Sequence, residues 1–156
     1  YLEASELHIK SLAEHLKGIH HLFIVGRGKS LSAVGTGALT IKESDHFHAE
    51  GMSCASFRHG PLDMLKAETL VIVIGGAPKT ETLNERLYGE IQEHGAKALL
   101  CAPSSDFEAT KIPEVADAAR PLVEILPLQM VTLALAALDE REAGKFDRVA
   151  KVTVVE

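Results

Sequence analysis

The segment that suits an anionic ligand best is Gly26, Arg27, Gly28, Lys29 and Ser30, which follows an apolar run and precedes a helical pattern. Glycines let a backbone approach a ligand closely, and the first turn of a helix offers free N–H groups. The arginine and the lysine add full positive charges. The spacing is not that of a P-loop. Two interpretations stay open: a ligand-binding turn, or an ordinary tight turn between strand and helix.

Glu43 falls near the end of the helix that this turn is expected to open. A carboxylate there opposes the helix dipole, which tends to raise its pKa and suits a general base. Thr36 lies seven residues earlier, on the same helical face, and joins the substrate-binding candidates. The alternative is a surface glutamate, paired with Lys42 or unpaired.

The run HFHAEG at 46–51, taken with Cys54 and FRHGP at 57–61, gathers possible metal ligands. Their spacing matches no compact zinc pattern, so we expect no metal. Gly60-Pro61 instead predicts a helix starting at Pro61, with His59 on an exposed elbow where a neutral imidazole shuttles protons. Arg58 beside it is a substrate-binding candidate. The alternative is a structural loop histidine.

Lys151 stands among valine and alanine in the tail 145–156. A lysine with an apolar environment loses its charge readily and can attack a carbonyl group. The alternative is an edge-strand lysine whose ammonium reaches solvent.

The elements that position these residues alternate along the chain. Helical patterns cover 5–17, 31–43, 80–94 with Thr80 as N-cap, and 128–139; apolar runs at 21–25, 69–74 and 97–101 predict strands, as do 120–125 and, more weakly, 149–155. Apolar strands between helices indicate a parallel sheet covered on both faces. We therefore predict an α/β fold, a three-layer α/β/α sandwich with a doubly wound parallel sheet. Ligands of such sheets bind beyond the carboxyl ends of the strands, after 25, 74 and 101.

Composition limits the classes of protein to consider. The 156 residues suit one domain, and the absence of Trp predicts an aliphatic core. A net charge of -6 argues against nucleic-acid binding. Glu124, Pro127 and Gln129 interrupt the longest apolar stretch, so we expect no membrane span. Cys54 and Cys101 are expected to be reduced thiols of a cytoplasmic protein.

The segments GRG, GALTIKE, HAE and FRHGPL, followed by PLQM at 127–130 and AKVTVVE at the end, together resemble the sugar isomerase (SIS) domain family. The similarity runs from about residue 20 to 156 and is greatest to the second, C-terminal SIS domain of glucosamine-6-phosphate synthase and its glutaminase-free relatives. It implies a flavodoxin-like fold, a phosphorylated sugar as ligand, no cofactor, a homodimer, and an N-terminal SIS domain before Tyr1.

The resemblance also implies roles for three residues. Glu43 matches the base that moves a proton between C1 and C2, His59 the histidine of ring opening that reaches a neighbouring subunit, and Lys151 the tail lysine that engages the sugar. The Ser/Thr phosphate loop of the family is absent after strand 69–74, where Gly75 to Thr80 read GGAPKT. The isolated chain is therefore expected to lack a complete substrate site.

Two functions compete. The first is an enzyme that isomerises a hexose or hexosamine 6-phosphate, with amination or deamination. The second is a phosphosugar-sensing module without catalysis. Retention of Glu43, His59 and Lys151 favours the enzyme, because a sensor needs no base.

Overall fold

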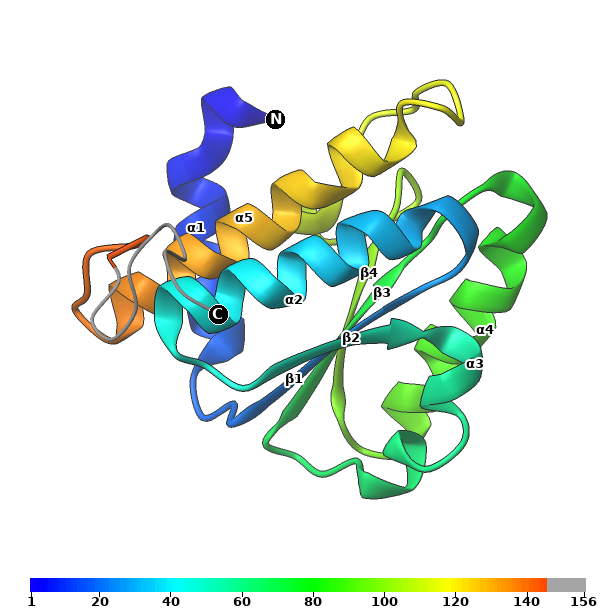
Figure 1. The fold of residues 1–156 in the computed structure, drawn as a ribbon, viewed down its shortest axis with the longest axis horizontal. Coiled ribbons are helices and arrows are strands. Elements are labelled where there is room, and N and C mark those ends of the chain that lie inside the picture. The colour runs from blue at the N-terminus through cyan, green and yellow to red at the C-terminus, as the bar shows by residue number, and fades with distance from the viewer. Residues whose placement is uncertain (146–156) are drawn as a thin grey trace, which may run out of the picture.

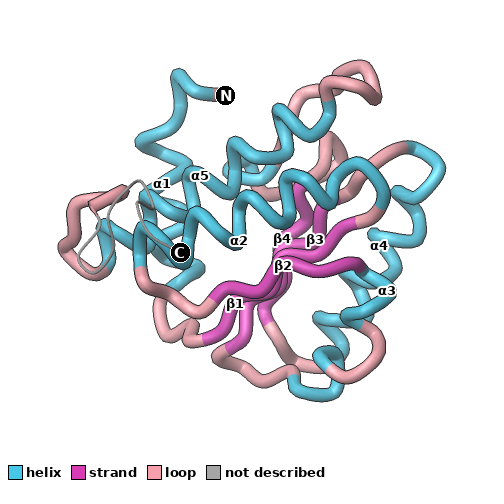
Figure 2. Tube along the Cα trace, in the orientation of Figure 1, coloured by secondary structure: helices cyan, strands magenta, loops and turns pink. Residues whose placement is uncertain are grey.

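A computed structural model describes residues 1–145 of the chain, so Lys151 and the predicted strand over 149–155 lie outside the described residues. Four strands form one parallel sheet in the order β2-β1-β3-β4 (Figure 2). Their bounds are β1 His21–Gly26, β2 Ala49–Ser53, β3 Thr69–Ile74 and β4 Lys97–Cys101. The predicted strands over 21–25, 69–74 and 97–101 correspond to β1, β3 and β4, which are neighbours in this sheet, and this confirms the parallel fold.

The helices cover both faces of the sheet (Figure 1). On one face lie α1 (Ser5–Leu16), α2 (Leu31–Asp45) and α5 (Arg120–Leu138), and on the other α3 (Cys54–Phe57) and α4 (Pro78–Glu93). Short 3-10 turns are η1 (Leu2–Ala4), η2 (Gly28–Ser30), η3 (Pro61–Met64) and η4 (Glu108–Thr110). The three-layer α/β/α sandwich is thus confirmed.

Alternate residues of each central strand serve the two layers. Leu22 and Ile24 of β1 pack with α1, α2 and α5, whereas Phe23 and Val25 pack with α3 and α4. All six residues of β3 are buried, as expected for a strand with helices on both sides. The core is aliphatic apart from Phe23 and Phe57, whose ring centroids lie 5.4 Å apart.

The structure corrects three local expectations. Residues 120–125 are helical and form the first part of α5, although their apolar run predicted a strand. Ala77, not Thr80, is the N-cap of α4, and Thr80 Oγ1 donates to the Ala77 carbonyl oxygen. The spacing of Leu7, Leu12 and Leu16 predicted one apolar face of α1, but Leu7 is exposed and His8 is buried beside Leu12 and Leu16 instead.

Helix α5 is long and apolar enough to cross a membrane by length and composition alone. It packs instead on α1 and α2 over the sheet, and half of its most apolar stretch is buried there. The charged residues Arg120 and Glu124 are also buried in it. We therefore assign α5 to the core of this domain.

Candidate functional site

A pocket of about 230 Å³ opens beyond the carboxyl ends of β1 and β3. In the chain order, α2 leads from β1 to β2 on one face of the sheet and α4 leads from β3 to β4 on the other, so the direction of winding reverses between β1 and β3. Ligands of doubly wound sheets bind at this switch point. We call it the cationic pocket; it is lined by Arg27, Gly28, Lys29, Ser30, Ala77, Lys79, Thr80, Asp117 and Arg120.

The glycines of the first turn have distinct structural roles. Gly28 has φ 58°, a left-handed conformation that favours glycine, and a Cβ placed there would meet open space. Gly26 is needed for packing, because a Cβ would lie 2.9 Å from Cγ2 of Val34. The turn therefore keeps Gly28 at the pocket while β1 and α2 remain in close contact.

Asn84 of α4 ties the two strand ends together beneath the pocket. Its side chain is fully buried, and its Nδ2 donates to the carbonyl oxygens of Ile74 and Gly75 at 3.0 and 2.8 Å. Its Oδ1 accepts a hydrogen bond of 2.9 Å from Nε of Arg27. The amide thus orients the arginine from a fixed point on the sheet.

Two ionisable side chains of α5 are buried at the pocket: Arg120 is part of the lining, and Glu124 contacts the lining residue Ser30. Oε1 of Glu124 accepts a hydrogen bond of 2.9 Å from Oγ of Ser30, while Oε2 has no partner among residues 1–145. Burial raises the pKa of Glu124, and the bond from Ser30 offsets part of that rise. Arg120, 6% exposed, contacts Glu114 at 3.7 Å through Nη2, and its Nε has no acceptor among the described residues.

At the rim, Nζ of Lys29 and Oδ2 of Asp117 form an ion pair at 2.5 Å. The hydrogen bond from Lys29 lowers the pKa of Asp117. Both side chains are about half exposed, and exposed pairs contribute little to stability. This pair is therefore an interaction that a stronger anion can replace.

The candidates Glu43 and Thr36 lie elsewhere, on the solvent-exposed side of α2. From Leu31 at the start of α2 to Glu43 near its end, 12 residues at 1.5 Å each span about 18 Å. Within one chain, the structure therefore does not bring Glu43 into the pocket formed by the Gly26–Ser30 turn.

His59 and Arg58 lie on the opposite face of the sheet from α2. His59 is exposed on an elbow between α3 and η3, and Pro61 begins η3, as predicted. Arg58 Nη1 pairs with Oε2 of Glu90 on α4 at 2.5 Å, so it joins neither the pocket nor Glu43. Lys151 lies outside the described residues.

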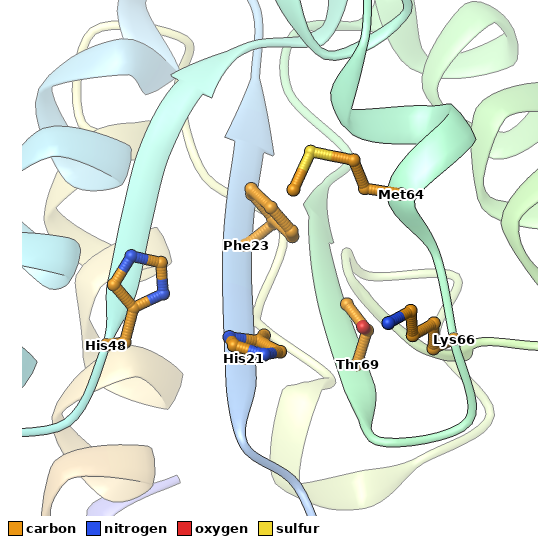
Figure 3. A pocket seen from close by; sticks show the side chains of 6 residues that line it. All are labelled: His21, Phe23, His48, Met64, Lys66 and Thr69. Carbon is orange, nitrogen blue, oxygen red and sulfur yellow. The ribbon is translucent and has the colours of Figure 1, made fainter.

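A second hollow, of about 280 Å³, lies at the amino ends of the strands (Figure 3). It is lined mainly by apolar surface, with the rings of His21 and His48 in an edge-to-face contact, 5.6 Å between centroids. The amino ends of parallel strands are not where such folds bind ligands. Among residues 1–145, no group of three or more His, Cys, Asp or Glu side chains could hold a metal ion.

The sequence pointed to the part of the cationic pocket formed by the loops after β1 and β3, but not to the part formed by Asp117 and Arg120. The rule that ligands bind after strands pointed to the segments after residues 25 and 74, which do meet there. Lys79 stands in the second of these segments and could have been singled out by that rule. Asp117 and Arg120 had no such signal, because the start of α5 resembled a strand.

The sequence from residue 15 to 138 matches the SIS domain family. The chain therefore belongs to the SIS domain family, and the parallel sheet with helices on both faces is the fold of its structural relatives.

Comparison with individual curated proteins shows which members of the family the sequence resembles. The chain is 33% identical, over 95% of its length, to glutamine–fructose-6-phosphate aminotransferase (isomerizing) of Thermococcus kodakarensis, and 32% identical to that of Yersinia pseudotuberculosis. It spans about a quarter of the length of these curated relatives, 25% and 26%.

Solved structures agree in fold. Glucosamine-6-phosphate deaminase from Thermotoga maritima superposes with a TM-score of 0.82 at 22% identity, over 98% of this chain and 46% of that one. The C-terminal domain of glucosamine-fructose-6-phosphate aminotransferase from Francisella tularensis gives 0.75 at 20% identity, over 90% and 42%.

Proposed function

We propose that this chain is the isomerase domain of an enzyme that interconverts the aldose and ketose forms of a hexose or hexosamine 6-phosphate, with amination or deamination. One observation carries the proposal. The carboxylate of Glu43 is exposed on α2, about two helical turns after the exposed Thr36. It forms no hydrogen bond or ion pair with any residue from 1 to 145. A general base must reach a substrate, and a free carboxylate on a rigid helix can do so.

The chemistry needs a proton moved between two neighbouring carbons. In the open-chain aldose, the Glu43 carboxylate removes the proton from C2, and the electron pair forms an enediolate with negative charge on the C1 oxygen. Return of the proton to C1, with protonation of that oxygen and deprotonation at O2, yields the ketose. A cation near the oxygens stabilises the enediolate, and Lys151 is the candidate. His59 would transfer the proton that opens the sugar ring.

The site is composite under this proposal. Glu43 and His59 lie on opposite faces of one sheet, so the histidine of one chain would serve the site of another, in a homodimer. The chain spans about a quarter of its curated relatives. A second SIS domain would then supply the groups that hold the substrate phosphate at Glu43.

The test is solvent-hydrogen exchange at C1 and C2 of the sugar phosphate, measured in the full-length protein. Glu43→Gln keeps the shape and removes the base, so we expect kcat to fall by about 10²–10⁴-fold with exchange lost and substrate binding retained. The matched control is Glu50→Gln, an exposed carboxylate on β2. Full exchange in Glu43→Gln would reject the base, and phosphosugar binding without turnover would then favour a sensing module.

The isolated 156 residues should show little or no turnover of fructose 6-phosphate, because the substrate site is composite. Robust turnover by this chain alone would contradict the composite site.

A further inference from the structure

We propose that His21 and His48 together bind one transition-metal ion of the class that imidazole prefers, Cu(II) or Zn(II), at the amino ends of the strands. His21 is the first residue of β1, and His48 directly precedes β2. Spacing along the chain predicted no metal for the run that contains His48. The sheet adds a second histidine from another strand, which spacing within that run does not show.

The parallel pairing of β1 with β2 brings the two side chains to one face of the sheet. Leu22 pairs with Ala49, and the N–H of Leu22 donates to the carbonyl oxygen of His48 at 3.2 Å. The residues before this pair, His21 and His48, therefore lie opposite each other and project from the same face. Both rings line the hollow at the amino ends of the strands (Figure 3). The ladder thus holds both imidazoles in place before any ion is bound.

The separation of the rings suits joint coordination of one ion. Their centroids lie 5.6 Å apart, and Figure 3 shows each ring with a nitrogen on the side that faces the other. A metal–nitrogen bond of about 2.0–2.1 Å puts the centre of a ligating imidazole about 3.2 Å from the ion. Two such rings lie about 4.5 Å apart at a ligand angle of 90° and about 6.3 Å apart when trans. The observed separation falls inside this window, so small side-chain rotations suffice.

The pair is free to take up an ion. Imidazole nitrogen is a preferred ligand of copper and zinc. Both rings are exposed, and among residues 1–145 neither forms a hydrogen bond or ion pair that binding would have to break. Within that range no third His, Cys, Asp or Glu side chain completes a cluster, so water fills the other coordination positions. The Irving–Williams order predicts tighter binding of Cu(II) than of Zn(II).

Two charged side chains of opposite sign lie near the pair. Glu50 stands two residues after His48 on the same face of β2, with about 6.6 Å between their Cα atoms. The exposed Lys66 also lines the hollow and repels a cation, but it lies beside Thr69 on the far side of His21 from His48 (Figure 3). Its long stem lets the ammonium group turn into solvent. These charges therefore do not exclude a cation.

An ion at this position would join two strands. Doubly wound sheets bind organic ligands at the carboxyl ends of their strands, but an ion held by two side chains does not need the loops found there. In the described part of the chain, β1 is the only ladder partner of the edge strand β2. A ligand that binds only the folded state stabilises it by mass action. Amide hydrogens of β2 should therefore exchange more slowly when the ion is bound.

The test is calorimetric titration of the 156-residue chain with copper(II) chloride and with zinc chloride. We expect one ion per chain, and the electron paramagnetic resonance spectrum of the Cu(II) complex should show splitting from two nitrogen ligands. His21→Gln and His48→Gln each remove one of two ligands. Each should weaken binding by at least the roughly 10–100-fold that loss of an outer-shell partner costs a metal site.

The matched control is His20→Gln, which removes an exposed histidine that does not line the hollow and should leave the affinity unchanged. Equal loss in this control would indicate unspecific binding to the eight histidines of the chain and refute the proposal. Parental affinity in His21→Gln or His48→Gln, or no binding by the parent, would do the same. A parent spectrum without two nitrogen ligands is decisive even if a variant fails to fold. Glu43→Gln should bind the ion as the parent does, because the site is independent of the isomerase assignment.

Discussion

Nε of Arg27 donates a hydrogen bond of 2.9 Å to Oδ1 of Asn84, across 57 positions of sequence. The same amide holds the carbonyl oxygens of Ile74 and Gly75 at the end of β3. One buried side chain therefore joins the end of β1, the end of β3 and the helix α4. The geometry of the cationic pocket depends on this amide.

Asn84→Ala should lower the free energy of unfolding by about 2–4 kcal/mol, because it leaves two buried carbonyl oxygens without their donor and removes the acceptor of Arg27. Urea denaturation measures this. Thr82→Ala on the exposed side of the same helix is the control and should stay within about 0.5 kcal/mol of the parent. A loss no larger than that of the control would show that the amide is not structural.

Asp45 should make stability depend on pH. Burial raises its pKa from 3.8 to about 7, against smaller opposing effects of Ser44 and Arg141. The folded state therefore holds the proton more tightly than the unfolded state. The stability that this proton contributes is fully present below about pH 4 and is lost as pH rises through 7. The free energy of unfolding falls by at most on the order of 4 kcal/mol over this range.

Asp45→Asn should remove the fall in the free energy of unfolding that Asp45 causes between pH 4 and 8. Urea denaturation at several pH values in this range measures this slope. Glu50→Gln, which changes an exposed carboxyl group, should leave it intact. An unchanged slope in Asp45→Asn would mean that another group titrates in this range.

Two glycines of α2 should respond in opposite directions to alanine. A Cβ at Gly37 would lie 2.4 Å from Cδ1 and 3.0 Å from Cβ of Leu128 on α5, so Gly37→Ala should destabilise by about 1–3 kcal/mol. At Gly35 a Cβ meets nothing within 4 Å, and Gly35→Ala should stabilise by about 0.5–1 kcal/mol through helix propensity. Thermal denaturation of both variants tests the packing of α2 on α5; the same sign for both would contradict it.

The thiols of Cys54 and Cys101 should be unreactive in the folded protein. Both are buried and free, and burial raises the pKa of each, which suppresses the reactive thiolate. A thiol-specific reagent should therefore label neither until urea unfolds the chain, and then both. Rapid labelling of one thiol in native buffer would show that its burial is transient.

Local pattern was sufficient for a fully apolar strand, for helices with a clear helical period, and for a turn fixed by glycine and proline. The run 69–74 predicted a strand that the structure places in the middle of the sheet with all six residues buried. The predicted helices over 31–43 and 80–94 correspond to α2 and α4, because their polar and apolar positions follow the helical period. The exposed elbow at His59 also followed from Gly60-Pro61, since Pro61 begins the short helix η3.

Other elements were decided by tertiary contacts. No apolar run marks residues 49–53, and the strand β2 exists through its parallel pairing with β1. The run 120–125 resembled a strand, but it continues through Pro127 into one helix that packs on α1 and α2. Short apolar runs fit either structure, so periodicity alone does not separate them.

The sequence by itself determined the family, the parallel α/β fold and the chemical types of the candidate residues, because these depend on pattern and composition within short segments. Only the tertiary structure showed that Arg27 and Lys79, 52 positions apart, line one pocket with Arg120, and that Glu43 lies at the far end of α2 from it. The physical reason is that parallel strands bring distant loops together at one edge of the sheet, whereas a rigid helix keeps its two ends apart.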